Sequence, residues 1–112
     1  MSAYNRRIEI PPMSLLRYAS LDDVRRAIQH RRLLSFSYRK QRVRVEPHLL
    51  GNARKTHALI LYGWRNAPVE GWEHFRFAEI RDLELLDEQF MNPRADFDPH
   101  DRKIAGIDTA VR

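Results

Sequence analysis

The sequence predicts a mainly β protein with one leading helix. One short stretch, residues 20–31, repeats its apolar residues at helical spacing. The sequence that follows, up to about residue 87, consists of short alternating segments separated by turn-forming residues. The chain has 112 residues, which suits a single domain with a modest core. We expect that domain at residues 20–90, between an N-terminal arm (1–19) and a C-terminal tail (91–112).

The N-terminal arm contains an apolar stretch around a proline pair, IEIPPMSLL at residues 8–16. The prolines exclude a helix interior in this stretch. So many apolar residues are unusual for a free tail, and we expect them to pack against the domain or against a neighbour. The arm therefore predicts a homodimer, or a complex with a different protein, formed through residues 8–16.

The helix is predicted at residues 20–31. Ser20 is a favourable N-cap residue, and Asp22 and Asp23 follow in the first turn, where carboxylates suit the helix dipole. Arg31 and Arg32 lie at the other end, where cations are favourable. The side chains that fall on one apolar face are Leu21, Val24, Ala27 and Ile28.

Five segments after the helix have the composition and alternation of short β-strands. The connection between the first two runs from Arg39, the last residue of the first segment, to Gln41, which is hairpin length. Proline and glycine residues separate most of the others. The five sequences are LLSFSYR (33–39), RVRVEP (42–47), THALILYGW (56–64), WEHFRFAEI (72–80) and RDLELLD (81–87).

This order of one helix and five strands predicts a small, strongly bent five-stranded β-barrel of the Sm-like or SH3-like kind. No alternation of strands and helices supports a parallel α/β sheet. We expect the remaining residues, 91–112, to form a tail that docks around Phe97, with a short turn near Ile104. The predicted core consists of Phe36, Val43, Val45, Leu59, Leu61, Phe75, Phe77, Ile80 and Leu85.

The charges divide unevenly along the chain. Lysine and arginine outnumber aspartate and glutamate by 14 − 4 = +10 in residues 1–65, whereas residues 66–112 carry 6 − 11 = −5. The excess is greatest in residues 31–55, where eight basic residues accompany one acidic residue, Glu46. A basic half suggests an anionic partner such as nucleic acid or a nucleotide. A solvated, arginine-rich face explains the charge equally well.

Two motifs resemble the WYL-domain family of bacterial regulators. The first is Arg-Val-Glu-Pro-His at residues 44–48, and the second is HFRFAEIRDLELLDEQF at residues 74–90. They occur in the family's order and at its separation, and the resemblance covers about residues 21–90. It implies an Sm/SH3-like barrel that senses a ligand, in several members nucleic acid or a nucleotide.

The chain departs from the family pattern at several positions. The tryptophan-tyrosine-leucine triplet of the family aligns with His57-Ala58-Leu59. Glu73 and Glu79 occupy two places where the family commonly has arginines. No helix-turn-helix fits before Leu21, so the chain resembles a stand-alone WYL-type domain.

The predicted ligand site is a basic strand face. Arg42 and Arg44 alternate onto one side of a strand, where arginine side chains can grip phosphates. The resemblance adds Arg76 from the Phe-Arg-Phe strand. We expect Pro47 to end the strand and His48 to emerge at the barrel rim, beside the loop that carries Arg54 and Lys55. Aromatic residues near the arginines in sequence, Tyr62 and Trp64, are the candidates for stacking on bases. A polar, solvated sheet face is the alternative interpretation.

The sequence contains no sign of catalysis or of a cofactor. There is no cysteine, and His48, His57 and His74 match no metal-ligand spacing. No serine occupies a nucleophile turn. We therefore predict a non-enzymatic sensor with no metal and no cofactor. Its alternative is a protein-interaction module in which the basic half of one copy meets the acidic half of another. The absence of cysteines and of a long apolar run predicts a cytoplasmic protein.

Overall fold

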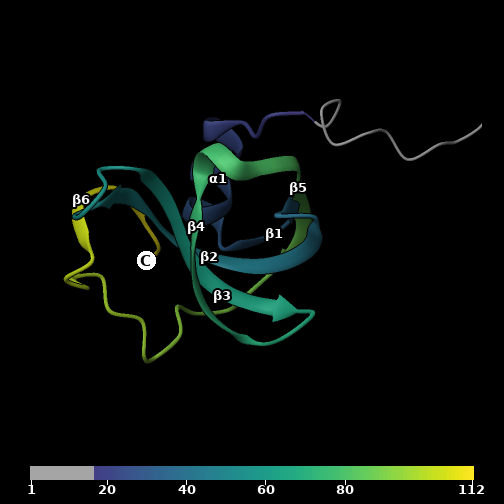
Figure 1. Ribbon diagram of the computed structural model, residues 1–112. Coiled ribbons are helices and arrows are strands. Elements are labelled where there is room, and N and C mark those ends of the chain that lie inside the picture. The colour runs from purple at the N-terminus through teal and green to yellow at the C-terminus, as the bar shows by residue number, and fades with distance from the viewer. Residues whose placement is uncertain (1–16) are drawn as a thin grey trace, which may run out of the picture.

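The computed structural model describes residues 17–112, and it is mainly β with one leading α-helix, as predicted (Figure 1). The described part contains six strands rather than the predicted five. A short 3-10 helix, η2, joins two of them. The elements are α1 (Leu21–His30), β1 (Arg32–Tyr38), β2 (Gln41–Ala53), β3 (Leu59–Ala67), β4 (Gly71–Arg76), η2 (Phe77–Glu79), β5 (Ile80–Gln89) and β6 (Ile104–Ala110).

The strands form one antiparallel sheet in the order β4-β3-β2-β1-β5, and β6 pairs with β2. Among the described residues no strand pairing joins β4 to β5, so the sheet is open. A side chain nevertheless connects β4, one end of this order, to β1, which lies next to the other end strand, β5. The hydroxyl of Tyr38, the last residue of β1, accepts a hydrogen bond of 3.0 Å from the backbone N–H of Arg76 in β4.

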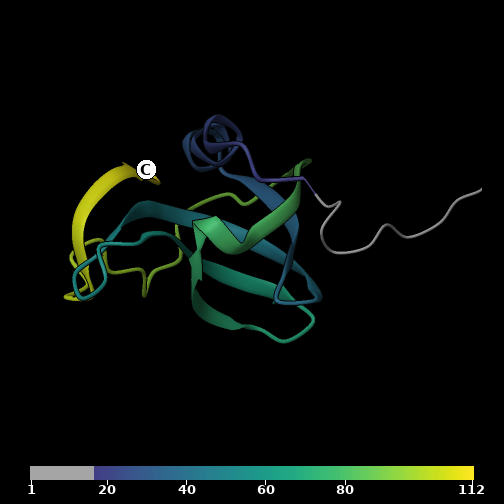
Figure 2. The same cartoon turned by 45° about the horizontal axis from the view of Figure 1, so that its top comes forward.

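Helix α1 begins and ends as its sequence indicates. The Ser20 hydroxyl accepts a hydrogen bond from the backbone N–H of Asp23, which satisfies one of the free donors of the first turn. Arg31 adopts a left-handed conformation (φ 52°), and its N–H reaches the carbonyl groups of the last turn. The helix lies against the sheet (Figure 2). Its apolar face packs there, with Val24, Ala27 and Ile28 fully buried.

The β1–β2 connection is a tight hairpin. Tyr38 pairs with Gln41, and the two residues between them, Arg39 and Lys40, have φ values of 50° and 68°. Positive φ at both central residues is the geometry of a type I′ turn, whose twist matches that of the flanking strands. The first two predicted strands therefore pair as expected.

Strand β6 lies in the segment that the sequence led us to treat as a tail. It pairs with the second half of β2, from Leu49↔Ala110 to Ala53↔Ile104. A register shift leaves Asp108 as an additional residue on β6, between the pairs Leu50↔Thr109 and Gly51↔Ile107. Such bulges redirect a side chain.

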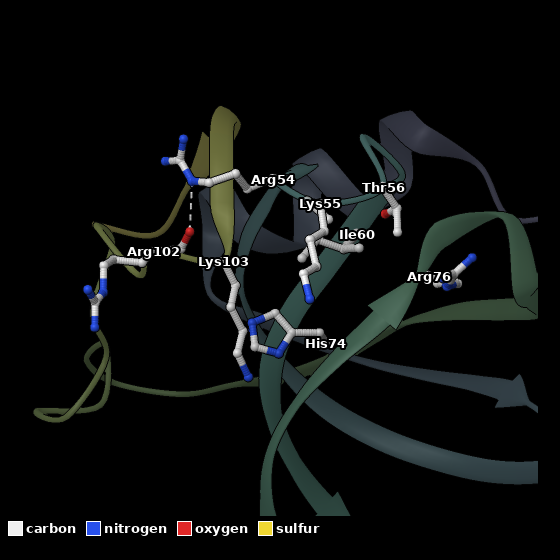
Figure 3. A pocket seen from close by; sticks show the side chains of 9 residues that line it. Arg54, Lys55, Thr56, Ile60, His74, Arg76, Arg102 and Lys103 are labelled. Carbon is white, nitrogen blue, oxygen red and sulfur yellow. Dashed lines mark hydrogen bonds between the residues drawn. The ribbon is translucent and has the colours of Figure 1, made fainter.

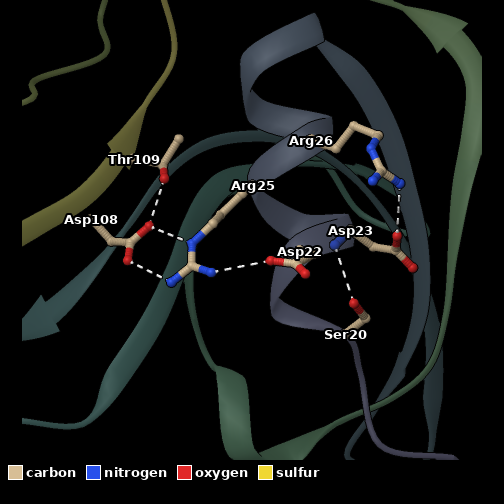
Figure 4. A network of polar contacts seen from close by, with 7 residues as sticks. All are labelled: Ser20, Asp22, Asp23, Arg25, Arg26, Asp108 and Thr109. Atoms are coloured by element: carbon tan, nitrogen blue, oxygen red, sulfur yellow. Dashed lines mark hydrogen bonds and ion pairs between the residues drawn. The ribbon is translucent and has the colours of Figure 1, made fainter.

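The Asp108 carboxylate points to α1 and accepts two hydrogen bonds of 2.9 Å from Arg25 (Figure 4). These hydrogen bonds lower the pKa of Asp108 to about 2. The ion pair joins the last strand to the helix across the fold, and Arg25 also contacts Asp22 on its own helix (Figure 4).

Two hydrophobic clusters lie on opposite faces of the sheet. The larger cluster, between α1 and the sheet, includes six of the nine predicted core residues as buried side chains, and Leu59, Phe77 and Leu85 pack against it half-buried. The second cluster was not predicted. It lies where the chain after β5 covers β2, β3 and β4. Its buried members are Leu49, Ile60, Tyr62 and Ile104, and Ala53, Trp72, Phe97 and Ala110 pack around them.

The described chain begins beside the edge of β5. Tyr18 forms an antiparallel bridge with Arg81, and the carbonyl oxygen of Arg17 accepts a hydrogen bond of 2.8 Å from Asp82. Residues 8–16, which we expect to mediate assembly, lie outside the described residues, so that expectation stays a prediction. Within residues 17–112, no helix has the length and apolar character needed to span a membrane.

Candidate functional site

The two arginines at the start of β2 face acidic residues of β5. Arg42 donates hydrogen bonds to the Ser35 hydroxyl (2.9 Å), to the carbonyl oxygen of Asp82 (2.9 Å) and to the Glu84 carboxylate (3.1 Å). Arg44 forms an ion pair with Glu88. The acidic strand therefore neutralises the basic strand within one chain. These contacts favour a structural role for both arginines over the anion-gripping role that we predicted.

Pro47 does not end the strand, contrary to the prediction. Strand β2 continues to Ala53, and Pro47 pairs with Gly63 of β3. The next pair is Leu49↔Tyr62, so His48 is an additional residue on β2. A proline is tolerated here because a bulge interrupts the ladder and needs no donor at that point.

His48 is fully buried, so the prediction that it emerges at the rim is wrong. The bulge directs its ring under the C-terminal segment, where it stacks on Phe90 at 5.1 Å. Its Nδ1 lies 2.9 Å from the carbonyl oxygen of Glu46, and its Nε2 accepts a hydrogen bond of 3.1 Å from the backbone N–H of Arg94. One donor and one acceptor define a neutral ring with the proton on Nδ1. Burial lowers the pKa of His48.

This buried neutral ring predicts a pH-dependent stability. The unfolded state binds a proton on His48 below about pH 6.5, whereas the folded state resists protonation, so stability falls as the pH decreases through that value. The slope due to one such group is at most about 1.4 kcal/mol per pH unit. Urea denaturation of the His48→Gln variant between about pH 7.5 and 5.5 should show a smaller slope than wild type. Replacement of the exposed His100 by Gln should leave the slope unchanged, and an equal slope in His48→Gln would refute the assignment.

Glu46, the residue before the proline, holds the same C-terminal segment. Its carboxylate accepts two hydrogen bonds from Arg94, at 3.0 and 3.1 Å, and its side chain is 11% exposed. The Arg94 guanidinium lies 4.1 Å from the centre of the Trp64 ring, in cation–π geometry. The Glu-Pro-His sequence therefore fastens residues 90–97 to the sheet.

Trp64 and Tyr62 are part of a row of aromatic rings rather than a free stacking surface. Tyr62 is 7% exposed and stacks between Trp72 (5.0 Å) and His74 (4.3 Å). The indole N–H of Trp72 donates to Asp96 in the covering segment. Trp64 meets Trp72 edge to face and lies under Arg94. Most of this row is therefore covered by the C-terminal segment, and His74 is its last ring.

A pocket of about 590 Å³ opens beside that last ring (Figure 3). Three parts of the chain form it: the turn after β2, the neighbouring ends of β3 and β4, and the residues just before β6. It includes five cationic side chains and contains no aspartate or glutamate among its lining residues. The lining is Ala53, Arg54, Lys55, Thr56, Ile60, His74, Arg76, Arg102 and Lys103.

Hydrogen bonds to backbone carbonyl groups fix part of this pocket. Arg54 donates to the carbonyl oxygen of Arg102 (2.9 Å; Figure 3) and to that of Ile104 (3.1 Å), which ties the turn after β2 to the start of β6. The backbone N–H of Lys103 donates to the carboxylate of Asp101, the acidic group beside the pocket. Burial lowers the pKa of His74, so its ring is neutral at pH 7.

Ion pairing distinguishes the pocket from the strand face. Within residues 17–112, Arg54, Lys55, Arg102 and Lys103 form no salt bridge, and Arg76 has one weak pair, 4.0 Å from Glu79. Glu79 itself binds Arg39 more closely, at 2.7 Å. Glu73, the other acidic departure from the family pattern, pairs with Arg65. The cations of the pocket therefore retain charge for a ligand.

Of the predicted site residues, only Arg76 lines this pocket. Arg42 and Arg44 contact β5. His48, Tyr62 and Trp64 instead pack against residues 90–97, the segment that follows β5. The sequence reasoning had noted Arg54 and Lys55 as neighbours of the site but missed Arg102 and Lys103. Both pairs are adjacent cations at the boundary of a strand, and this shared signal could have drawn attention to them.

The family model of the WYL domain matches residues 19–85. The chain belongs to the WYL-domain family. WYL domains are generally regulatory or ligand-sensing domains. In this WYL domain the matched region includes α1 and most of the sheet, whereas residues 90–97, which cover the aromatic row, and β6 lie beyond it. Comparison with curated proteins and comparison with solved structures each gave no match.

Proposed function

We propose that this WYL domain is a non-enzymatic sensor that binds an anionic ligand, a single-stranded nucleic acid or a nucleotide, in the basic pocket. The sensor acts in transcription regulation or in another nucleic-acid-related control process. The observation that supports it is the gathering of five cationic side chains around one pocket whose lining has no carboxylate. A phosphate group is the common biological anion that such a cluster of lysine and arginine suits.

The electrostatics of the two basic regions support the pocket over the strand face. On the strand face, an anion would have to displace Glu84 and Glu88 from Arg42 and Arg44. In the pocket, an anion would meet cations that have no close carboxylate partner in the described chain. Like charges held near each other repel, and an incoming anion relieves that repulsion. Binding there should consequently depend strongly on salt.

Neutral substitutions of Arg76 and Lys103 test the pocket. Each change, Arg76→Gln and Lys103→Gln, should weaken binding of an anionic ligand about tenfold, and should lower the dependence of log affinity on log salt by about one. The measurement is a fluorescence-anisotropy titration with short single-stranded oligonucleotides and with labelled nucleotides, at several salt concentrations. Both side chains extend from the pocket wall, so the variants should unfold at the wild-type urea concentration.

Two matched controls remove the same charge elsewhere. Arg26→Gln changes an exposed arginine on α1, and Lys40→Gln changes an exposed lysine in the β1–β2 turn. Equal losses in control and pocket variants would show that net charge alone matters and would refute the pocket. If no anion binds wild type at low salt, the sensor proposal fails. The protein-interaction alternative would then be examined by sedimentation, which reports assembly directly.

A further inference from the structure

We propose that the pocket selects a compact nucleotide, whose base packs against His74 while its phosphates contact the surrounding cations. This inference rests on the proposed anion-binding function and narrows its ligand class. Three observations carry it: the size of the pocket, the aromatic row that ends at its wall, and the covering of the rest of that row.

The pocket has the size of a small-molecule site. Its volume of about 590 Å³ falls within the range of roughly 300–1,000 Å³ typical of pockets that enclose one small ligand. The cations that line it come from the turn after β2, from the residues before β6 and from Arg76 of β4. Lys55 and Lys103 extend beside the His74 ring, whereas the guanidinium groups of Arg54 and Arg102 point away from it (Figure 3). Cations around one hollow suit clustered phosphates, such as those of a nucleoside diphosphate, better than the evenly spaced phosphates of a strand.

The wall of the pocket offers a surface for a flat ring. One face of the His74 ring stacks on Tyr62, with an angle of 19° between the planes, and His74 also lines the pocket. Ile60 and Ala53 add apolar surface beside it. A base placed against His74 would extend the row Trp72–Tyr62–His74 by one more ring, at the separation that aromatic pairs prefer.

The same row disfavours a single strand as the ligand. Binding successive bases requires successive exposed rings. Here Tyr62 is 7% exposed, Trp72 is hydrogen-bonded to Asp96, and Arg94 lies over Trp64. Among the rings of this row, only His74 lines the pocket, so the site has one stacking position.

Isothermal titration with three probes separates the possibilities: ADP, inorganic pyrophosphate and a short oligothymidylate. We expect ADP to bind at least about tenfold more tightly than pyrophosphate, which has the phosphates without the base. His74→Ala should weaken ADP binding by about 10- to 100-fold, the range measured for loss of one base–aromatic stack, and should leave pyrophosphate binding unchanged. His74→Phe, which keeps a ring, should retain most of the ADP affinity. His100→Ala, at an exposed histidine outside the pocket, is the matched control.

The outcomes distinguish this inference from the function on which it rests. Equal affinities for ADP and pyrophosphate, or equal loss of both in His74→Ala, would overturn the base position while the anion pocket stands. Binding of the oligothymidylate alone would also overturn the compact ligand and retain the sensor. If none of the three probes binds, both the inference and the proposed function are wrong.

Discussion

Replacing Gly51 by alanine should destabilise the domain by about 3 kcal/mol, because no space exists for the added methyl group. A Cβ atom at Gly51 would lie 2.3 Å from the backbone carbonyl oxygen of Gly106 and 3.2 Å from a methyl carbon of Leu49. The carbonyl belongs to β6, so relief requires β6 to move away from β2. Urea denaturation followed by circular dichroism should show the lower midpoint.

Gly106→Ala is the matched control for this substitution, because both glycines lie in the β2–β6 strand pair, where Gly106 is the partner of Asn52 and Gly51 that of Ile107. The nearest atom to a Cβ at Gly106 is the side-chain oxygen of Asn52, at 3.9 Å, which is an ordinary contact. We expect a change within about 0.5 kcal/mol of wild type. Similar stabilities for the two variants would mean that β6 does not pack on β2 as closely as described.

The second large effect is expected from Glu46→Ala, which leaves the Arg94 guanidinium without its partner. Removal of one member of a buried ion pair typically costs about 3–5 kcal/mol. Because the Arg94 side chain is 35% exposed and water can partly replace the lost contact, we expect about 2 kcal/mol here. The release of Arg94 from Trp64 should also change the tryptophan fluorescence of the folded protein.

The control for Glu46 is a carboxylate in an exposed ion pair. Glu84 binds Arg42, but its side chain is 70% exposed, so Glu84→Ala should cost no more than about 1 kcal/mol. A double-mutant cycle with Arg94→Ala isolates the coupling between Glu46 and Arg94. Additive effects in that cycle would contradict the role assigned to the Glu-Pro-His sequence.

Local sequence patterns predicted the helix and the strands of the main core well. Ser20, the two aspartates after it and the apolar spacing of α1 act within a few residues, so the sequence alone identifies them. Alternation likewise identified Phe36, Val43 and Val45 as core residues. Strand β6 was missed because its sequence, IAGIDTA, has weak alternation and is mostly exposed. Its stability depends on pairing with β2, a contact that no local pattern reveals.

In the candidate site, too, the sequence predicted the local features but not the contacts between distant segments. Periodicity correctly assigned Arg42 and Arg44 to a strand, but it contains no information about the acidic strand β5 that faces them. Pro47 suggested the end of a strand because its missing N–H is a local property. The bulge that accommodates it depends on the register with β3. The pocket brings together Arg54 and Lys103, and their proximity follows from the pairing of Ala53 with Ile104.

The late position of β6 in the chain has a consequence for the order of folding. The β1–β2 hairpin closes a turn of two residues, whereas β6 must find a strand more than 50 residues earlier. Contacts between distant segments carry the larger loop-closure cost and form slowly, and a chain that is being synthesised produces β6 only after β1 to β5. The core between α1 and the sheet can therefore assemble before the pocket exists. A ligand that binds only the complete pocket stabilises the state in which β6 is paired with β2, by mass action. The ligand concentration would therefore set the fraction of molecules in which β6 is paired.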